Sequence, residues 1–376
     1  MTSKKNLQYK VVSIVGARPQ FIKLGLVSQA LKAAGRKIRE ILIHTGQHYD
    51  YKMSDLFFEE LQLKTPDYHL QCGSGSHGTQ TGKMLFGIEQ VLYRERPDLV
   101  LVFGDTNTTL AGALAAVKLC IPVAHVEAGL RSNNWAMPEE VNRVITDRLS
   151  SILFCPTNRS RENLKREGIQ KNVHVVGDVM IDMLRHFESI AERRSGILKK
   201  LGLSSKAYYL STLHRPVNAD QPVVLGRLLR LFRTLDLPVI FPVHPRTRKQ
   251  LRTHELGAFK NLRLIDPVGY LDMVLLEKYA KAILTDSGGI QKEAYYFHVP
   301  CLTLRDETEW VETVESGWNR VVGTDPRTIL STLRTLPTGT GRNHLFGDGN
   351  ASQKIALKIR NYLEEKTALS AERRIS

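Results

Sequence analysis

The chain has 376 residues, of which 42% are hydrophobic and 24% are charged, and its formal net charge at pH 7 is +15. This length is enough for two domains with full hydrophobic cores, and the composition excludes an intrinsically disordered chain. No apolar run approaches the roughly 20 residues of a membrane span, and no signal peptide is recognisable, so we expect a cytoplasmic protein.

The cysteines and the basic residues each exclude a class of protein. The four cysteines form no CxxC pair, so we expect free thiols and neither disulfides nor a metal site. Lysines and arginines are distributed through the predicted helices and tails, without aromatic stacking platforms or a nucleic-acid motif. We therefore expect no nucleic-acid partner, and a dianionic small substrate accounts equally well for the positive charge.

In chain order, short apolar runs alternate with helical segments through the first half. Strands are predicted at 11–15, 39–45, 97–105, 121–127, 152–156 and 173–177. Residues 73–82 contain four glycines and are predicted to be a substrate-covering loop or a linker before a helix at 83–93. Continuous apolar runs that alternate with helices are typical of buried parallel strands, so residues 1–177 are predicted to form a doubly wound domain.

The first predicted strand ends in a glycine-containing turn that leads into a helix from residue 19. A strand followed by such a turn and a helix N-terminus can hold an anion on backbone N–H groups. Arg18 and Lys23 lie at this turn, where both could reach a diphosphate, and solvated surface positions are the alternative. The turn is not a GxGxxG sequence, so it does not favour a dinucleotide.

Carboxylates follow the two predicted central strands. Asp105 comes just after one strand, Glu127 ends the next, and Glu139 lies on the following loop or helix start. Because ligand crevices of open α/β sheets lie at the carboxyl ends of the strands, we expect these side chains to share one crevice. Neighbouring carboxylates suit proton abstraction and return. In the alternative structural interpretation, Asp105 caps the next helix, and Glu139 and Glu140 are solvated acids of a first helical turn.

The pattern repeats in the second half, over residues 178–352. A charged helical connection at 178–203 precedes strands predicted at 208–213, 239–243, 262–266, 282–285, 301–304 and 320–322. His214-Arg215, His244 and Asp286-Ser287-Gly288-Gly289 follow three of these strands, and Glu293 could bind ribose hydroxyls one helical turn later. Residues 353–376 are predicted to form a helix that packs back across the domain junction, followed by a tail. The fold class is α/β, with two Rossmann-like doubly wound domains facing a cleft, as in GT-B architectures.

Seven stretches in order resemble the non-hydrolysing UDP-N-acetylglucosamine 2-epimerase family over nearly the whole chain. They are GARPQFIK (16–23), GDTNTT (104–109), HVEAGLR (125–131), PEEVNR (138–143), HR (214–215), PVHP (242–245) and TDSGGIQ (285–291). The resemblance implies proton-handling carboxylates at Asp105, Glu127 and Glu139. It also implies a UDP-sugar site with diphosphate contacts from Arg18, Lys23 and the catalytic His214, phosphate and ribose contacts from Ser287, Gly288 and Glu293, and uracil contacts near Tyr270 and Leu271.

The family's chemistry inverts C2 of an N-acetylhexosamine, where the hydrogen is not acidic. Removal of that proton and expulsion of UDP leave a 2-acetamidoglucal, and UDP then adds back with protonation on the other face. A base, an acid and cations for the departing UDP meet the requirements, so the resemblance implies no metal and no other cofactor. It further implies a homodimer that supplies surface polysaccharide precursors.

Some positions depart from the family pattern. Gln20 replaces a usual glutamate, Val217 replaces an acid of the His-Arg-x-Glu-Asn motif, and Gln47-His-Tyr-Asp50 replaces the activator stretch Gln-His-Arg-Glu. Gln47, Arg215 and His244 remain as in the family's activator site and are candidates for such a site here, with activation by substrate left open. RDETEWVE at 305–312 resembles the branch of UDP-2,3-diacetamido-glucuronate 2-epimerases, which leaves the sugar open as well.

Three other functions compete with this one. A GT-B glycosyltransferase would use a UDP-sugar with an acceptor groove, and would not need three carboxylates in the N-terminal half. A non-catalytic basic protein would only bind a nucleotide sugar or a nucleic acid. A hydrolysing epimerase would release the free sugar.

Overall fold

The computed structural model describes residues 8–35, 37–46, 64–243, 245–251, 261–339 and 344–372. The chain divides into two compact units. Unit 1 comprises Met1–Met183 and His344–Ser376, and unit 2 comprises Leu184–Asn343. The boundaries proposed from the sequence fall after residues 177 and 352.

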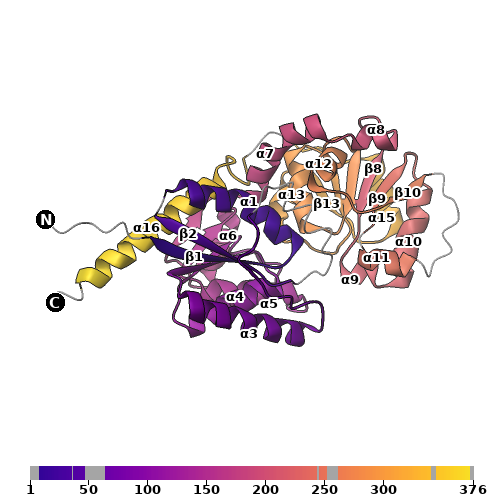
Figure 1. Ribbon diagram of the computed structural model, residues 1–376. Helices are drawn as coiled ribbons and strands as arrows, with labels where there is room; N and C mark the ends of the chain where they lie inside the picture. Colours follow the sequence, from indigo (N-terminus) through magenta and orange to yellow (C-terminus); the bar gives the residue numbers. More distant parts are fainter. Residues whose placement is uncertain are drawn as a thin grey trace. The chain divides into compact units, whose positions relative to one another are not determined.

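Unit 1 is built on a seven-stranded sheet in the order β3-β2-β1-β4-β5-β6-β7, in which all neighbours are parallel. Figure 1 shows this unit with helices on both sides of the sheet. The strands are β1 (Tyr9–Val15), β2 (Ile38–His44), β3 (Tyr68–His69), β4 (Leu99–Phe103), β5 (Val123–Val126), β6 (Ile152–Cys155) and β7 (Val173–Val175). The chain starts in the middle of the sheet, grows to one edge and returns to build the other, which is the doubly wound order. The two-residue β3 is an addition to the predicted strands.

Helices cover both faces of this sheet. They are α1 (Arg18–Ala33), α3 (His77–Glu95), α4 (Asn107–Lys118), α5 (Pro138–Leu149), α6 (Asn158–Arg166), α7 (Val179–Arg194), which continues into unit 2, and α16 (Ala351–Glu372). Val11 and Val15 of β1 lie in one core cluster with α1 and α16, whereas Val12 and Ile14 lie in another with α3 and α4. Burial on both faces explains why the strands are continuous apolar runs.

The loop predicted over residues 73–82 is wrong from His77 onward, where α3 begins. Three glycines inside the helix lower its intrinsic propensity by about 1 kcal/mol each relative to alanine. The helix is nonetheless held to its surroundings, because Gln80 donates to the Gly73 carbonyl at 2.8 Å and accepts from Asn107 at 2.9 Å. Tertiary contacts therefore override the glycine signal.

Helix α16 returns the end of the chain to unit 1 and packs against α1. Ile355 and Ile359 share a core cluster with Val27 and Leu31 of α1. The carboxylate of Asp182 accepts hydrogen bonds from the backbone of Ala351 and Ser352, at 3.1 and 2.7 Å, and so caps the first turn of α16.

Unit 2 repeats the same topology with six parallel strands in the order β10-β9-β8-β11-β12-β13. They are β8 (Tyr209–Thr212), β9 (Val239–Pro242), β10 (Leu262–Ile265), β11 (Ala282–Thr285), β12 (Cys301–Thr303) and β13 (Asn319–Val321). The helices are α8 (Ile197–Leu201), α9 (Pro216–Ala219), α10 (Pro222–Arg233), α11 (Pro245–Leu251), α12 (Tyr270–Lys278), α13 (Gly288–Tyr296), α14 (Val311–Glu315) and α15 (Pro326–Arg334). Two parallel sheets with flanking helices confirm the predicted α/β two-domain class.

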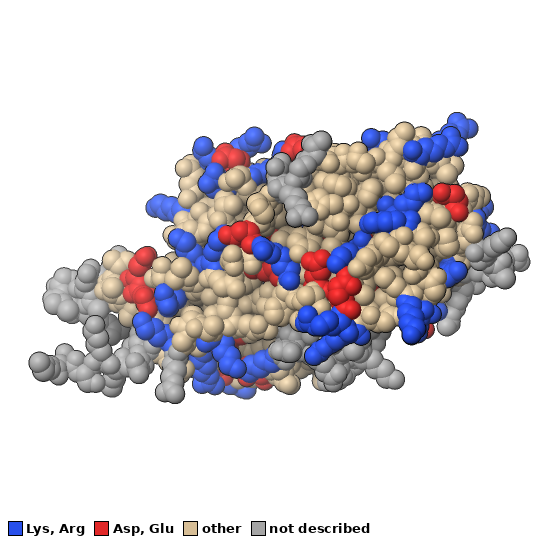
Figure 2. All heavy atoms as spheres, turned by 90° about the horizontal axis from the view of Figure 1, so that it is seen from above, with Lys and Arg blue, Asp and Glu red and all other residues tan. Residues whose placement is uncertain are grey.

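One face of the molecule shows how its surface charges are distributed. On the face shown in Figure 2, Lys and Arg side chains are scattered among Asp and Glu side chains and form no continuous basic surface. Within the part of the chain that the structure describes, no helix is both long and apolar enough to cross a membrane.

Candidate functional site

The strands that carry the predicted carboxylates are neighbours. β4 and β5 pair in parallel, and the Gly104 N–H donates to the Val126 carbonyl at 2.9 Å just beyond β4. Asp105 and Glu127 therefore lie at the same edge of the sheet, as expected. The helix cap expected of Asp105 in the structural interpretation is wrong, because Thr106 is the N-cap of α4.

Glu127 forms an ion pair with Lys23 of α1, and the two residues are only 9% and 7% exposed. The backbone of Glu127 has φ +76°, a left-handed conformation that is strained for a residue with a Cβ. The N–H groups of Glu127 and Ala128 both donate to the Phe154 carbonyl, at 3.1 and 3.0 Å, and hold this conformation. A buried ion pair on a strained turn is a common feature of functional sites.

Gly104 makes room for that ion pair. Its φ is +64°, and a Cβ built on it would lie 3.0 Å from Nζ of Lys23 and 3.1 Å from Oε2 of Glu127. Glycine is therefore favoured here both by the backbone conformation and by the close approach of the two side chains, which a Cβ would force to shift.

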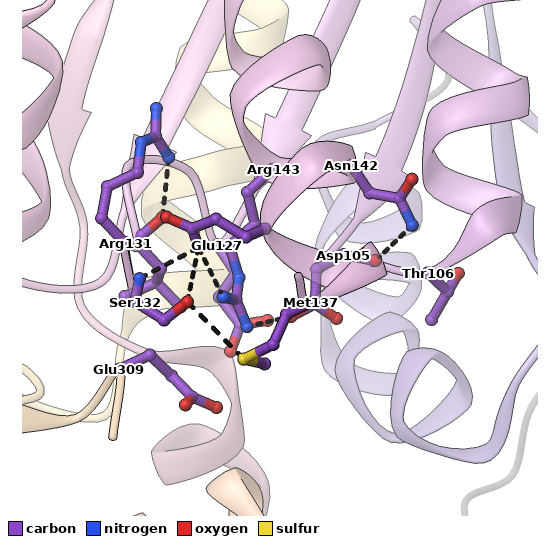
Figure 3. A network of polar contacts seen from close by, with 12 residues as sticks. Asp105, Thr106, Glu127, Arg131, Ser132, Met137, Asn142, Arg143 and Glu309 are labelled. Carbon is purple, nitrogen blue, oxygen red and sulfur yellow. Dashed lines mark hydrogen bonds and ion pairs between the residues drawn. The ribbon is translucent and has the colours of Figure 1, made fainter. Parts of the chain in front are cut away.

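Asp105 is held by Arg143, which is only 2% exposed and which the sequence interpretation did not single out (Figure 3). Nη2 of Arg143 pairs with Oδ2 of Asp105, and Nη1 pairs with Glu140 at 2.9 Å. Asn142, the neighbouring residue on α5, donates to the backbone carbonyl of Asp105 at 2.9 Å. Asp105 is thus fixed through both its side chain and its backbone.

Glu140 is buried and is not the solvated acid of the structural interpretation. Its carboxylate accepts from the backbone N–H groups of Ser132 and Asn133, both at 2.9 Å. Burial favours the neutral acid, but these hydrogen bonds and the Arg143 guanidinium outweigh it and lower the pKa of Glu140. Glu139, one residue earlier, is half-buried in the first turn of α5 and has no hydrogen-bond or ion-pair partner among the described residues.

A second buried network lies under the Gly104 turn. His125 of β5 contacts the Gly104 carbonyl through Nε2 at 2.8 Å and Asp147 through Nδ1 at 2.7 Å. Asp147 also accepts from the Gly129 N–H at 3.0 Å and from Arg131 at 2.7 Å. Although burial opposes ionisation, His125 and Arg131 lower the pKa of Asp147. The signal in the sequence was a histidine inside an otherwise apolar strand.

The N–H groups of the turn after β1 are already hydrogen-bonded. Oε1 of Gln20 accepts from Gly16 at 2.8 Å and from Ala17 at 3.1 Å, and Nε2 of Gln20 donates to the Phe103 carbonyl at 2.9 Å. These two N–H groups, expected to hold an anion, are therefore bound to Gln20 instead. Arg18 is the first residue of α1, but its side chain lies outside the described part of the structure, as do Gln47 and His244.

In unit 2, the predicted residues lie at the carboxyl ends of β8 and β11, which are neighbours. Asp286 follows β11 and is fully buried, and its carboxylate contacts Nδ1 of His214 at 3.2 Å. Burial opposes ionisation, but His214 and the hydrogen bonds from the 215–218 segment lower the pKa of Asp286. Arg215 lies 3.6 Å from the carboxylate of Glu309.

The N-terminus of α13 is closely packed. Ser287 is its N-cap, without a side-chain hydrogen bond, and a Cβ on Gly288 would lie 2.4 Å from a carboxylate oxygen of Glu309. Glu293 is buried one turn further along α13, and Tyr270 and Leu271 are buried at the start of α12. Among the described residues, no group of three or more His, Cys, Asp or Glu side chains could hold a metal ion.

Comparison with known proteins gives one consistent result. A family model described as UDP-N-acetylglucosamine 2-epimerase matches residues 29–360. The chain is 53% identical to a Methanococcus maripaludis protein named UDP-N-acetylglucosamine 2-epimerase homolog, over 94% of this chain and 99% of the relative. It is 47% identical to the Pseudomonas aeruginosa UDP-2,3-diacetamido-2,3-dideoxy-D-glucuronate 2-epimerase, over 92% of this chain and 98% of the relative.

Solved structures agree with the sequence relatives. The crystal structure of Methanocaldococcus jannaschii UDP-GlcNAc 2-epimerase in complex with UDP-GlcNAc and UDP is similar, with a TM-score of 0.88 and 45% identity. The similarity covers 94% of this chain and 99% of that one. Together with the seven motifs, these matches place both units within one known family. The chain belongs to the UDP-N-acetylglucosamine 2-epimerase family.

Proposed function

We propose that the protein is a non-hydrolysing 2-epimerase that inverts C2 of a UDP-N-acetylhexosamine by elimination and re-addition of UDP. The observation that supports this best is the paired edge of β4 and β5. There, two carboxylates from adjacent strand ends, Asp105 and Glu127, each contact a buried cation. The relatives named above act on UDP-GlcNAc and on a UDP-diacetamido-glucuronate, as their names state.

The reaction needs a base, an acid and support for the leaving group. In the elimination, a carboxylate takes the C2 proton, the C–H electron pair forms a C1–C2 double bond, and UDP leaves with the C1–O pair. UDP then attacks C1 while an acid protonates C2 on the opposite face. Asp105, Glu127 and Glu139 are the proposed proton carriers, and Lys23 offsets the negative charge that develops on the diphosphate.

The proposed nucleotide contacts come mainly from unit 2. The positive end of the α13 helix dipole favours a phosphate near Ser287 and Gly288. Under the proposal, His214 and Arg18 contact the diphosphate, Glu293 the ribose, and the backbone near Tyr270 and Leu271 the uracil. The proposed domain boundaries lie after residues 177 and 352.

Further parts of the proposal concern the cellular context. We propose a cytoplasmic homodimer that supplies precursors of surface polysaccharides. Arg215, with Gln47 and His244, is proposed as part of an activator site. The P. aeruginosa relative makes the diacetamido-uronate analogue of UDP-GlcNAc the second candidate sugar.

The test is turnover in deuterated water followed by NMR. The protein is incubated in separate samples with UDP-GlcNAc and with the UDP-diacetamido-uronate. With one of these two sugars, we expect deuterium at C2 of both the substrate and its C2-epimer. Asp105→Asn, which keeps the side-chain shape, is the matched control and should incorporate far less. Absence of deuterium from both sugars contradicts the proposal, and release of the free sugar identifies a hydrolysing enzyme instead.

A further inference from the structure

Asp286 is a buried carboxylate to which the described structure directs several donors from one short segment. Its oxygens accept from the backbone N–H groups of His214, at 3.1 and 3.2 Å, and of Arg215, at 3.1 Å. Nδ2 of Asn218 donates to it at 3.1 Å and to the Leu304 carbonyl at 2.9 Å. The segment that begins after β8 is thereby folded around a carboxylate at the end of β11.

The same carboxylate determines how the imidazole of His214 is held. Oδ1 of Asp286 lies 3.2 Å from Nδ1 of His214, whereas the His214 side chain as a whole is 45% exposed. An ionised carboxylate can only accept hydrogen bonds, and the pKa of Asp286 is lowered, so the close approach of Oδ1 to Nδ1 favours the tautomer that carries its proton on Nδ1. The nitrogen available to an incoming ligand is then Nε2.

We propose that Asp286 is a positioning residue that fixes His214 with Nδ1–H toward its carboxylate and Nε2 toward the diphosphate of the substrate. This inference rests on the proposed function, because it takes His214 to contact the leaving group. With a carboxylate at Nδ1 and a diphosphate at Nε2, the ring donates through both nitrogens and carries a positive charge. That charge stabilises UDP as it departs from C1 and holds it for re-addition.

A purely structural role for Asp286 would leave the ring without a defined tautomer. The direct test is therefore nitrogen NMR of the full chain with labelled histidines. The chain has 12 histidines, and the signals of His214 are identified by their loss in His214→Asn. We expect an Nδ1-protonated ring in the free protein, and protonation of both nitrogens when UDP is added. In Asp286→Asn, the fixed tautomer should be lost.

Asn218→Ala is the matched control, because it removes a hydrogen bond to the same carboxylate but leaves the Nδ1 contact in place. It should keep the His214 tautomer even where it lowers the melting temperature. Asp286→Asn should lower kcat by about 10-fold or more, which is the scale of losing an orienting partner. It should also raise the amount of glycal released per turnover. Adding His214→Asn to Asp286→Asn should give little further loss, because the two residues act as one unit.

The outcomes separate this inference from the proposed function. An Nε2-protonated His214 in the free protein, or an unchanged tautomer in Asp286→Asn, overturns the positioning role even if the wild type is an active epimerase. Conversely, a wild type that incorporates no deuterium but shows the expected tautomer and its response to UDP contradicts only the epimerase activity.

Discussion

The ammonium of Lys23 contacts the carboxylate of Glu127, although the two residues are 104 positions apart in the chain. Lys23 comes from the second turn of α1 and Glu127 from the end of β5, so the pair connects a helix to a strand across the sheet edge. It places a buried cation in direct contact with Glu127, which is proposed above as a proton carrier. Substitutions that keep the shape of the carboxylates at this edge should therefore affect chemistry more than folding.

The carboxylates give the first prediction. Asp105→Asn, Glu127→Gln and Glu139→Gln should each lower kcat by about 100-fold or more, because each removes a positioned acid or base while keeping the side-chain shape. Glu162→Gln, on the exposed side of α6, is the control and should turn over like the wild type. Turnover is measured as epimer formation by NMR, and wild-type rates in all three site variants would contradict the assignment.

The sequence predicted that Asp105 and Glu127 follow neighbouring strands, but not which residues hold them. Continuous apolar runs identify buried strands, and parallel strands have their carboxyl ends at one edge, so the proximity of Asp105 and Glu127 followed from the pattern. The contact of Arg143 with Asp105 joins residues 38 positions apart and depends on how α5 packs, which periodicity does not specify. Gln20 was noted only as a departure from the family pattern, and its hydrogen bonds to the turn after β1 were not predicted, because an amide that fills a turn looks in sequence like an ordinary helix residue.

Arg143 gives the second prediction. Arg143→Met leaves the carboxylates of Asp105 and Glu140 without their shared cation, which should lower the free energy of unfolding by about 3 kcal/mol, as for other broken buried ion pairs. Arg143→Lys keeps a charge but not the planar fork that contacts both partners, so its effect should be intermediate. Arg148→Met, on the exposed face of the same helix, is the control.

Stability is measured by urea unfolding, and hydrogen exchange of peptides from α5 assigns the effect to unit 1. Equal stability of Arg143→Met and Arg148→Met would show that the Arg143 contacts contribute nothing to the folded state. A loss of kcat in Arg143→Lys without a loss of stability would instead assign Arg143 to the orientation of Asp105.

Acid stability gives the third prediction. The pKa values of Asp147 and Asp286 are lowered in the folded protein, because their charged and hydrogen-bonding partners outweigh burial. The unfolded chain therefore binds more protons, so the stability they contribute is present above the unfolded pKa of about 4 and is lost as pH falls through the folded values. The raised pKa of buried Asp182 acts in the opposite direction.

We expect unfolding to become easier below about pH 5 and Asp147→Asn to flatten this dependence in unit 1. The measurement is hydrogen exchange at several pH values, corrected for intrinsic rates, with peptides from α5 compared with peptides from α15 in unit 2. If the α5 peptides of Asp147→Asn show the same pH dependence as those of the wild type, Asp147 does not contribute to acid unfolding.

Gly104 gives the last prediction, and the chain offers a closely matched control. Gly104 and Gly168 have φ values of +64° and +77°, but a Cβ on Gly168 would meet nothing within 4 Å, whereas one on Gly104 would meet Lys23 and Glu127. Gly168→Ala should therefore lose only the conformational term of about 1 kcal/mol. Gly104→Ala should lose more, and its kcat should fall by about 100-fold because the ion pair is displaced from its working position. If the two variants lose the same stability and Gly104→Ala keeps the wild-type kcat, the close approach of Lys23 and Glu127 at Gly104 has no part in catalysis.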